Sequence, residues 1–278
     1  MNEDAAALVV AFLYEFKMVG DQFQDIALCA ETVWTSDPDR FLSAVTANSV
    51  VRDRLMVLYA FNIEVSRSAW VTAEPMVAEM RLQWWLDAIE EIFDGGEVRR
   101  HQVVTPLAKL VRSLGLRRNW LDGLVQARRW DIYKKAHVDQ DALNAYLAQT
   151  GGGLMGLTVA ASGGDGSVGY EYGAGCAVAR LLVAAPALEK SGRYPLVDGT
   201  EAGVKLLAEL GLTKVKASSR MLCKTPRSAR AALRADWLAQ LILRQAIMRP
   251  GLVSVGGLGV SAARKKLRLM RLTAFEGF

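Results

Sequence analysis

Histidine and cysteine are scarce in this chain, and their scarcity argues against several kinds of site. The histidines are His101 and His137, so catalysis built on histidine is not expected. The three cysteines, Cys29, Cys176 and Cys223, are far apart and odd in number. This pattern indicates free thiols in a reducing compartment, not a disulfide framework or a zinc site.

Long apolar runs are also missing. No stretch of about 18 apolar residues occurs, so no segment is expected to span a bilayer. The chain begins with an acidic segment, Met1 to Asp4, where a signal or transit peptide would be basic. These features predict a cytoplasmic protein. Residues 1–17 are interpreted either as part of the mature chain or as an extension ahead of a domain that begins near Met18.

Apolar residues are plentiful, and the net charge is small. Hydrophobic residues make up 51 % of the 278 residues, which is enough for a substantial core, and the seven tryptophans are expected to pack. The formal charge of +5 suits an acidic partner, a diphosphate or an anionic membrane surface, and identifies none of them. Because the basic residues are spread out and no base-reading motif is present, nucleic-acid binding is not expected.

Helical spacing dominates the apolar pattern. Over 77–93 the apolar residues recur at intervals of three and four, which predicts one buried stripe on a helix. The stripe comprises Leu82, Trp85, Leu86, Ile89 and Phe93. The segment 51–65 is richer still in apolar residues, which predicts a central helix. Further helices are expected at roughly 21–34, 38–46, 104–114, 118–134, 139–160, 169–188, 200–221, 227–246 and 259–273.

The helix starts and breaks between these segments favour one domain. Asp37-Pro38 and Asp139 are typical of helix starts, and glycines interrupt the pattern near 95, 163–166 and 192–199. No sustained alternation of apolar and polar residues predicts a strand. The sequence therefore predicts an all-α domain over 21–278, preceded by an N-terminal extension over 1–20.

Three local features have both a functional and an ordinary interpretation. The glycines at 151–156 lack the preceding strand and the Gly-Lys-Ser/Thr of a phosphate loop, so close helix packing is the better interpretation. Asp87 and Glu91 are spaced to share one helix face and can hold Mg²⁺, although such pairs are usually surface residues. The basic segment 264–272 is either a solvated face of a packed helix or a contact for an anionic membrane or partner.

Two stretches resemble the squalene/phytoene synthase family. The run from Arg52 to Val65, with Leu58-Tyr59-Ala60-Phe61 in it, is similar to the early helix that leads into the family's first aspartate-rich motif. Glu74-Pro75-Met76 and the run from Arg81 to Phe93 resemble a divergent branch that includes the mitochondrial complex I assembly factor. Looser similarity continues through 128–131, 146–156 and 173–195.

The resemblance implies an isoprenoid-synthase fold, a bundle of helices around a central cavity. Working members join two prenyl diphosphates head to head, and Mg²⁺ on two facing aspartate motifs neutralises the leaving diphosphate. Residues expected at the ligand, with Arg180 and Arg193 also suited to phosphate contacts, are Arg52, Tyr59, Asn62, Arg81, Gln83, Trp84, Arg180 and Arg193.

The sequence departs from the family where the aspartates are expected. The first position reads Ser66-Arg67-Ser68-Ala69-Trp70, and the second, near 183–188, reads Val-Ala-Ala-Pro-Ala-Leu. Neither segment contains a carboxylate, so no resident metal and no catalytic residue are expected.

Three hypotheses follow. The first is a degenerate family member that acts in respiratory complex I assembly or binds an isoprenoid or lipid, with a cytoplasmic location that extends to the periphery of the inner membrane (the matrix side in a eukaryote). The second is an active synthase that holds Mg²⁺ on the non-standard ligands Asp87, Glu91, Glu64 and Asp131. The third is a helical interaction scaffold with a filled cavity.

Overall fold

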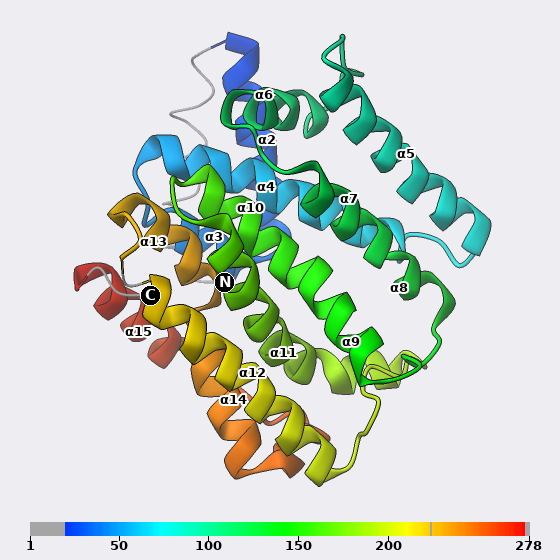
Figure 1. Ribbon diagram of the computed structural model, residues 1–278, viewed down its shortest axis with the longest axis vertical. Helices are drawn as coiled ribbons and strands as arrows, with labels where there is room; N and C mark the ends of the chain where they lie inside the picture. Colours follow the sequence, from blue (N-terminus) through cyan, green and yellow to red (C-terminus); the bar gives the residue numbers. More distant parts are fainter. Residues whose placement is uncertain (1–19, 223, 276–278) are drawn as a thin grey trace.

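The computed structural model describes residues 20–222 and 224–275, with side chains from residue 24 onward. Within that part of the chain every regular element is helical, so the all-α prediction is confirmed (Figure 1). The extension at 1–20 lies outside the described residues except for Gly20, and its boundary stays a prediction. The helices are α2 (Gly20–Ser36), α3 (Pro38–Ala44), α4 (Ser49–Ser68), α5 (Pro75–Asp94), α6 (Val104–Leu114), α7 (Arg118–Ala127), α8 (Arg129–Tyr133), α9 (Gln140–Leu147), the π-helical turn η1 (Ala148–Gly152), α10 (Gly153–Ala161), α11 (Gly166–Lys190), α12 (Glu201–Leu222), α13 (Arg227–Leu233), the 3₁₀ turn η2 (Arg234–Asp236), α14 (Ala239–Met248), the 3₁₀ turn η3 (Pro250–Leu252) and α15 (Ala262–Ala274).

Helix α4 is central, as its composition predicts. The Asn48 side chain caps it by accepting from the Val51 backbone N–H at 3.0 Å. Its side chains from Leu55 to Ile63 are buried on every face, because α4 packs against α2, α3, α5, α6, α10, α13 and α7. Ser66 lies in its last turn, and the half-exposed Trp70 follows the end of the helix.

Helix α11 is the second central element and runs through the middle of the molecule (Figure 1). Glycines let it touch η1 and α10 directly. A Cβ added to Gly173 would lie 2.4 Å from the Cβ of Met155 and 2.5 Å from the carbonyl oxygen of Gly151, which no side chain tolerates. The interpretation of the 151–156 glycines as close helix packing is therefore confirmed.

Helix α5 buries most of its predicted stripe. Leu82, Trp85 and Ile89 are buried, whereas Phe93, at the last turn, is 36 % exposed. The helix ends at Gly95 with φ +80°, a left-handed conformation that glycine adopts without strain. The last predicted position of the stripe thus lies at the rim of the bundle.

Three predicted helices are divided in the structure. The segment 118–134 breaks into α7 and α8 around Arg128, and 139–160 contains the π-helical turn η1 where the glycines meet α11. The segment 227–246 is interrupted by η2. Propensity alone does not reveal these breaks, because each one serves a contact with a distant helix.

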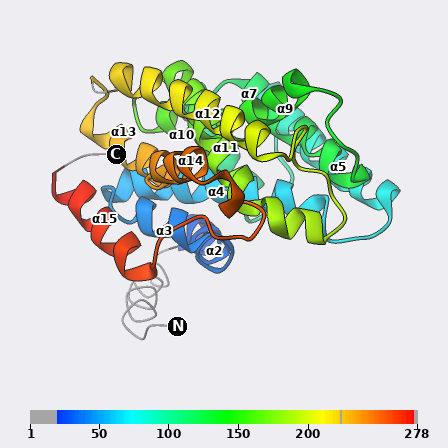
Figure 2. The same ribbon diagram turned by 90° about the horizontal axis from the view of Figure 1, so that it is seen from below.

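The C-terminal helix α15 lies at the edge of the molecule, beside α3 and at the opposite end from α5 (Figure 2). Ser261 caps it by accepting from the Arg264 backbone N–H at 3.4 Å. Leu269 is buried, and the Lys265 ammonium lies 2.7 Å from Asp39. These contacts hold α15 against the body and leave its other face to solvent.

Candidate functional site

A central pocket of about 250 Å³ lies between the C-terminal end of α4 and the middle of α11. Asn62 and Trp70 line it from the α4 side, and Ala184 and Leu188 line it from α11. Arg40 of α3 and the segment around Arg128 complete the wall. The pocket therefore lies between the two segments where the resemblance places the aspartate motifs.

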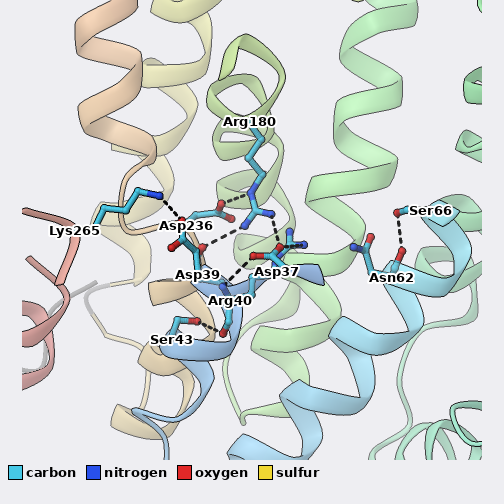
Figure 3. A network of polar contacts seen from close by, with 10 residues as sticks. Asp37, Asp39, Arg40, Ser43, Asn62, Ser66, Arg180, Asp236 and Lys265 are labelled. Carbon is cyan, nitrogen blue, oxygen red and sulfur yellow. Dashed lines mark hydrogen bonds and ion pairs between the residues drawn. The ribbon is translucent and has the colours of Figure 1, made fainter. Parts of the chain in front are cut away.

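An ion-pair network borders the pocket (Figure 3). Asp37 caps α3 by accepting from the Arg40 backbone N–H at 3.0 Å, and its other oxygen lies 3.2 Å from the Arg40 guanidinium. On α11, Arg180 donates through Nε to Asp236 at 2.5 Å and through its NH2 nitrogen to the Ala235 carbonyl oxygen at 3.2 Å. The network joins α3, α11 and η2, which are far apart in sequence.

The charges in this network support one another. Burial tends to raise the pKa of Asp37, but the guanidiniums of Arg40 and Arg180 outweigh it and hold that pKa below its ordinary value. The Arg180 guanidinium loses hydration on burial, yet Asp236 and Asp37 raise its pKa. Arg180 therefore stays cationic at physiological pH. It lines both the central pocket and a neighbouring cavity of about 400 Å³ that contains Asp37, Asp236 and Lys265.

A second cluster forms the opposite wall. Arg128 donates to Tyr146 at 3.0 Å and to Asp131 at 3.2 Å, and the Tyr146 hydroxyl donates to Asp131 at 3.0 Å. Trp130 stacks on His137 with ring centroids 4.0 Å apart. This closed triangle fixes the Arg128 guanidinium at the pocket.

Trp70 and Arg193 close one side of the pocket. The Arg193 guanidinium carbon lies 3.7 Å from the centroid of the Trp70 ring, and Arg193 also donates to the carbonyl oxygen of Asp131. Arg193 is buried, whereas Trp70 is half-exposed. A cation–π contact thus joins the end of α4 to the segment after α11.

The residues of the two motif segments do not fit Mg²⁺. Mg²⁺ requires oxygen ligands in near-octahedral geometry, and carboxylates usually supply the protein's share. Here Ser66 donates to the Asn62 carbonyl oxygen at 2.6 Å, while Trp70 and Leu188 present carbon to the pocket. The charged side chains that line the pocket are mostly arginines. Within 24–222 and 224–275, no group of three or more His, Cys, Asp or Glu side chains is arranged to hold a metal ion.

The expected ligand residues do not share one location. Asn62 and Arg180 line the central pocket, Arg193 contacts its Trp70, and Tyr59 is fully buried beneath Arg40 with its ring centroid 5.4 Å from that guanidinium. Arg81 and Trp84 instead line a separate, mostly apolar hollow of about 400 Å³ between α4 and α5. Gln83 donates to Asp87 at 2.8 Å, and Arg52 pairs with Asp53 at 3.1 Å.

The four carboxylates considered as non-standard metal ligands lie in different places. Asp87 accepts from Gln83, and Glu91 accepts from Arg99 in a contact of 2.5 Å on the outer part of α5. Glu64 lies 3.2 Å from the Arg67 guanidinium, at the α4–α5 hollow. Only Asp131, of these four, lines the central pocket. The structure does not bring them together.

Several residues of the site have no separate signal in the sequence. Arg40 and Asp37 belong to a segment recognisable only as a helix start, and Asp236 lies in a segment expected to be continuous helix. Arg128 lies in a stretch of loose family resemblance, where the sequence indicated only Asp131, as a non-standard metal ligand. Trp70 is visible as the residue at a missing aspartate, but its partner Arg193 is more than 100 residues away. The pairing of distant side chains is what sequence reasoning missed.

Within residues 20–222 and 224–275, none of the helices combines the length and apolarity that crossing a bilayer requires.

The chain is similar to one protein family and to several complex I assembly factors. The chain matches the squalene/phytoene synthase family over residues 34–183. It is 27 % identical over 132 residues to the human NADH dehydrogenase (ubiquinone) complex I assembly factor 6, an alignment that covers 47 % of this chain and 39 % of that protein. The Drosophila melanogaster homolog is 33 % identical over 105 residues, with 36 % of this chain and 31 % of the homolog covered. These alignments thus span about a third to two fifths of the relatives.

Solved structures share the fold at low sequence identity. A dehydrosqualene synthase in complex with ligand superposes with a TM-score of 0.76 at 16 % identity, covering 92 % of this chain and 99 % of the other. Squalene synthase HpnC from Alicyclobacillus acidocaldarius gives a TM-score of 0.69 at 17 % identity, covering 83 % and 95 %. The helical bundle around a central cavity is confirmed.

Proposed function

Because this chain belongs to the squalene/phytoene synthase family, which it matches over residues 34–183, we propose that it is a catalytically degenerate member that acts in the assembly of respiratory complex I. The proposal has two parts. The first is the loss of prenyl transfer, and the second is a role as an assembly protein.

One observation carries the first part. The pocket between the two motif segments is lined by guanidiniums, and the Trp70–Arg193 contact occupies its side. Ionising a prenyl diphosphate requires its developing charge to be neutralised while two substrates are held in one cavity. A pocket of about 250 Å³ is smaller than the roughly 300–1,000 Å³ of ordinary small-molecule sites, so it offers little room for two prenyl chains.

Resemblance to named relatives supports the second part. The mammalian, Dictyostelium and Drosophila relatives carry the name of complex I assembly factor 6 or its homolog. The partners we propose are therefore assembly intermediates of complex I.

The outer face of α15 supports a location at the membrane periphery. Arg264, Lys266 and Arg271 are exposed there together with Leu267 and Met270. Basic side chains interleaved with apolar ones on one helix face favour an anionic bilayer surface. We propose contact with the inner membrane, on the matrix side if the source is a eukaryote, from an otherwise cytoplasmic location.

Isoprenoid or lipid binding is the other activity compatible with a retained pocket. The apolar hollow between α4 and α5, with Trp84, Trp85 and Met80 in its lining, is the feature that favours it. A purely structural scaffold is the outcome in which neither pocket takes a ligand.

Two assays test the proposal. Purified protein incubated with farnesyl or geranylgeranyl diphosphate and Mg²⁺ is expected to yield no squalene or phytoene, and product formation would overturn the first part. Deletion of the gene is expected to lower NADH:quinone oxidoreductase activity in membranes, with rescue by the wild-type chain. Unchanged complex I after deletion would overturn the second part.

A matched variant separates assembly from hidden catalysis. D87N/E91Q removes two of the non-standard ligand candidates on the outer part of α5. Under the proposal this variant rescues complex I as well as the wild type does. Loss of rescue by a stably folded D87N/E91Q protein would favour the enzyme hypothesis instead.

A further inference from the structure

Helix α12 presents an uncharged stripe to solvent. Five exposed side chains, spaced three and four residues apart, lie within an arc of about 80° at 3.6 residues per turn, opposite the side that packs against α11 and α14. They are Leu206, Leu210, Thr213, Ala217 and Met221. Leu206 and Met221 are 60 % and 64 % exposed. A solvated helix usually carries charges on its outer side, so this stripe is typical of a helix that packs against a partner.

The stripe can be covered without leaving a polar group unsatisfied. The Thr213 hydroxyl donates to the Glu209 carbonyl oxygen at 2.8 Å, so its hydrogen needs no water. Thr213 and Ala217 are small and lie in the middle of the stripe, which lets a second backbone approach there. The 22 residues of α12 extend over about 33 Å at 1.5 Å per residue, a length that suits another helix.

The charges beside the stripe differ between the two halves of α12. The exposed charged residues are Glu201, Lys205 and Glu209 in the N-terminal half and Lys214, Lys216 and Arg220 in the C-terminal half. Two acidic groups and one basic group give the first half a formal charge of −1, and three basic groups give the second half +3. Antiparallel packing of two copies brings these unlike halves together, whereas parallel packing brings the two basic halves together.

We propose that α12 is the contact between two copies of this chain, which pack antiparallel about a two-fold axis near Thr213. In this arrangement Leu210 lies against Ala217 of the second copy, so each stripe covers the other. Glu209 lies beside Arg220 of the second copy, and symmetry repeats this pair. The proposal is independent of the proposed function, because neither the loss of prenyl transfer nor the assembly role enters it.

Helix α15 is not part of this contact. Figure 2 shows α12 along one edge of the molecule and α15 along the opposite edge. Pairing through α12 therefore leaves the exposed side chains of α15 accessible, and contact of α15 with an anionic vesicle does not require a second copy.

Sedimentation equilibrium of the full chain tests the proposal. A contact made by one pair of helices is smaller than the roughly 1,200–2,000 Å² of stable complexes, so we expect a dissociation constant of about 10–100 µM. Between about 1 and 300 µM, the measured mass is expected to rise from that of one copy toward that of two. A mass of one copy over the whole range would overturn the proposal, and the stripe would then fit a different protein.

A matched pair of variants locates the contact. L210R puts a cation into the stripe, opposite the basic half of the second copy, and is expected to weaken dimerisation at least about tenfold. L267R makes the same exchange at an exposed leucine of α15 and is expected to change dimerisation less than about twofold. Circular dichroism checks that both proteins remain helical. Equal dimerisation of the two variants would overturn the assignment to α12.

A charge exchange tests the antiparallel arrangement. E209K and R220E each place like charges together and are expected to weaken dimerisation about fivefold, because an exposed ion pair contributes little but is lost twice. E209K/R220E restores opposite charges between the copies and is expected to recover the wild-type dissociation constant. Glu209 and Arg220 lie about 16 Å apart along one helix, so recovery reports a contact between copies. A double variant that dimerises no better than the single variants would overturn the antiparallel arrangement.

Discussion

The central pocket and the outer face of α15 both gather arginines, but they hold them differently. In the pocket, Arg128 and Arg180 each bond to a carboxylate within 3.2 Å. On α15, Arg264 and Arg271 stand in solvent. Fixed guanidiniums select a ligand by geometry, whereas exposed ones attract any anionic surface and are screened beyond about 10 Å at 0.1 M salt. The same residue type is therefore held by ion pairs in one region and left to interact with any anionic surface in the other.

The largest expected effect comes from removing a carboxylate that fixes a pocket arginine. D236A leaves the Arg180 guanidinium without its acceptor at 2.5 Å, in a location where the Asp236 side chain is 8 % exposed. The expected loss in the free energy of unfolding is about 3 kcal/mol, the lower part of the range for breaking a buried pair, since Arg180 is partly hydrated. Urea unfolding measures it.

The control is a pair of the exposed kind. D122A removes the partner of Arg118 on α7, a contact of 3.2 Å between residues one turn apart. Its expected cost is below about 0.5 kcal/mol. Similar costs for D236A and D122A would erase the distinction between fixed and exposed charges.

A smaller effect is expected from opening the side of the pocket. R193Q removes the cation–π contact at 3.7 Å and should cost about 1–2 kcal/mol, because Arg193 is desolvated. Acrylamide quenching of tryptophan fluorescence should increase as Trp70 becomes more accessible. The control R117Q removes an exposed guanidinium that lies 4.6 Å from the centroid of the buried Trp120 ring, and it is expected to change neither property measurably. Equal quenching in both variants would contradict the role of Arg193.

The pH dependence of stability sharpens the comparison further. The pKa of Asp37 lies below its ordinary value in the folded chain, chiefly because the guanidinium of Arg40 outweighs burial. A depressed pKa adds stability above the unfolded value near 3.9, and this stability disappears as the pH falls through the folded value. The melting temperature should therefore fall below about pH 4, and less steeply in D37N. A D37N profile parallel to the wild type would show that the pair contributes nothing.

Changes to α15 are expected to have the smallest effect on stability and the clearest effect on binding to anionic membranes. K266E/L267S alters only exposed side chains, so the unfolding free energy should change by less than about 0.5 kcal/mol. Flotation with anionic vesicles should show binding by the wild type that salt weakens and the variant lacks. K205E/L206S makes the same exchange on α12 and should bind as the wild type does. Vesicle binding by K266E/L267S would show that α15 does not face the membrane.

The sequence predicts the helical class and the central helices because these depend on local periodicity. The stripe of α5 and the burial of α4 follow from apolar residues spaced three and four apart. The close packing of η1 was predictable because its glycines have no side chains. The division of 118–134 does not, since Arg128 turns toward Tyr146, 18 residues later. Contacts across the bundle decide where such a helix stops.

For the site, the sequence predicts only which residues are missing. The sequence reveals that Ser66 to Trp70 and 183–188 lack carboxylates, but not that arginines replace them. Asp37 is recognisable as the cap of α3, while its contact with Arg180 depends on how α3 and α11 cross. Pairing across more than 100 residues leaves no pattern in a single sequence.

The glycine contact between η1 and α11 also constrains motion. Because the backbones of Gly151 and Gly173 approach closely, little side-chain volume lies between those two helical segments, and we expect the wall that they form to be rigid. Widening the chamber from that side would require separating two main chains. The opposite side of the chamber is closed only by side chains, among them the half-exposed ring of Trp70, so we expect the chamber to adjust there first.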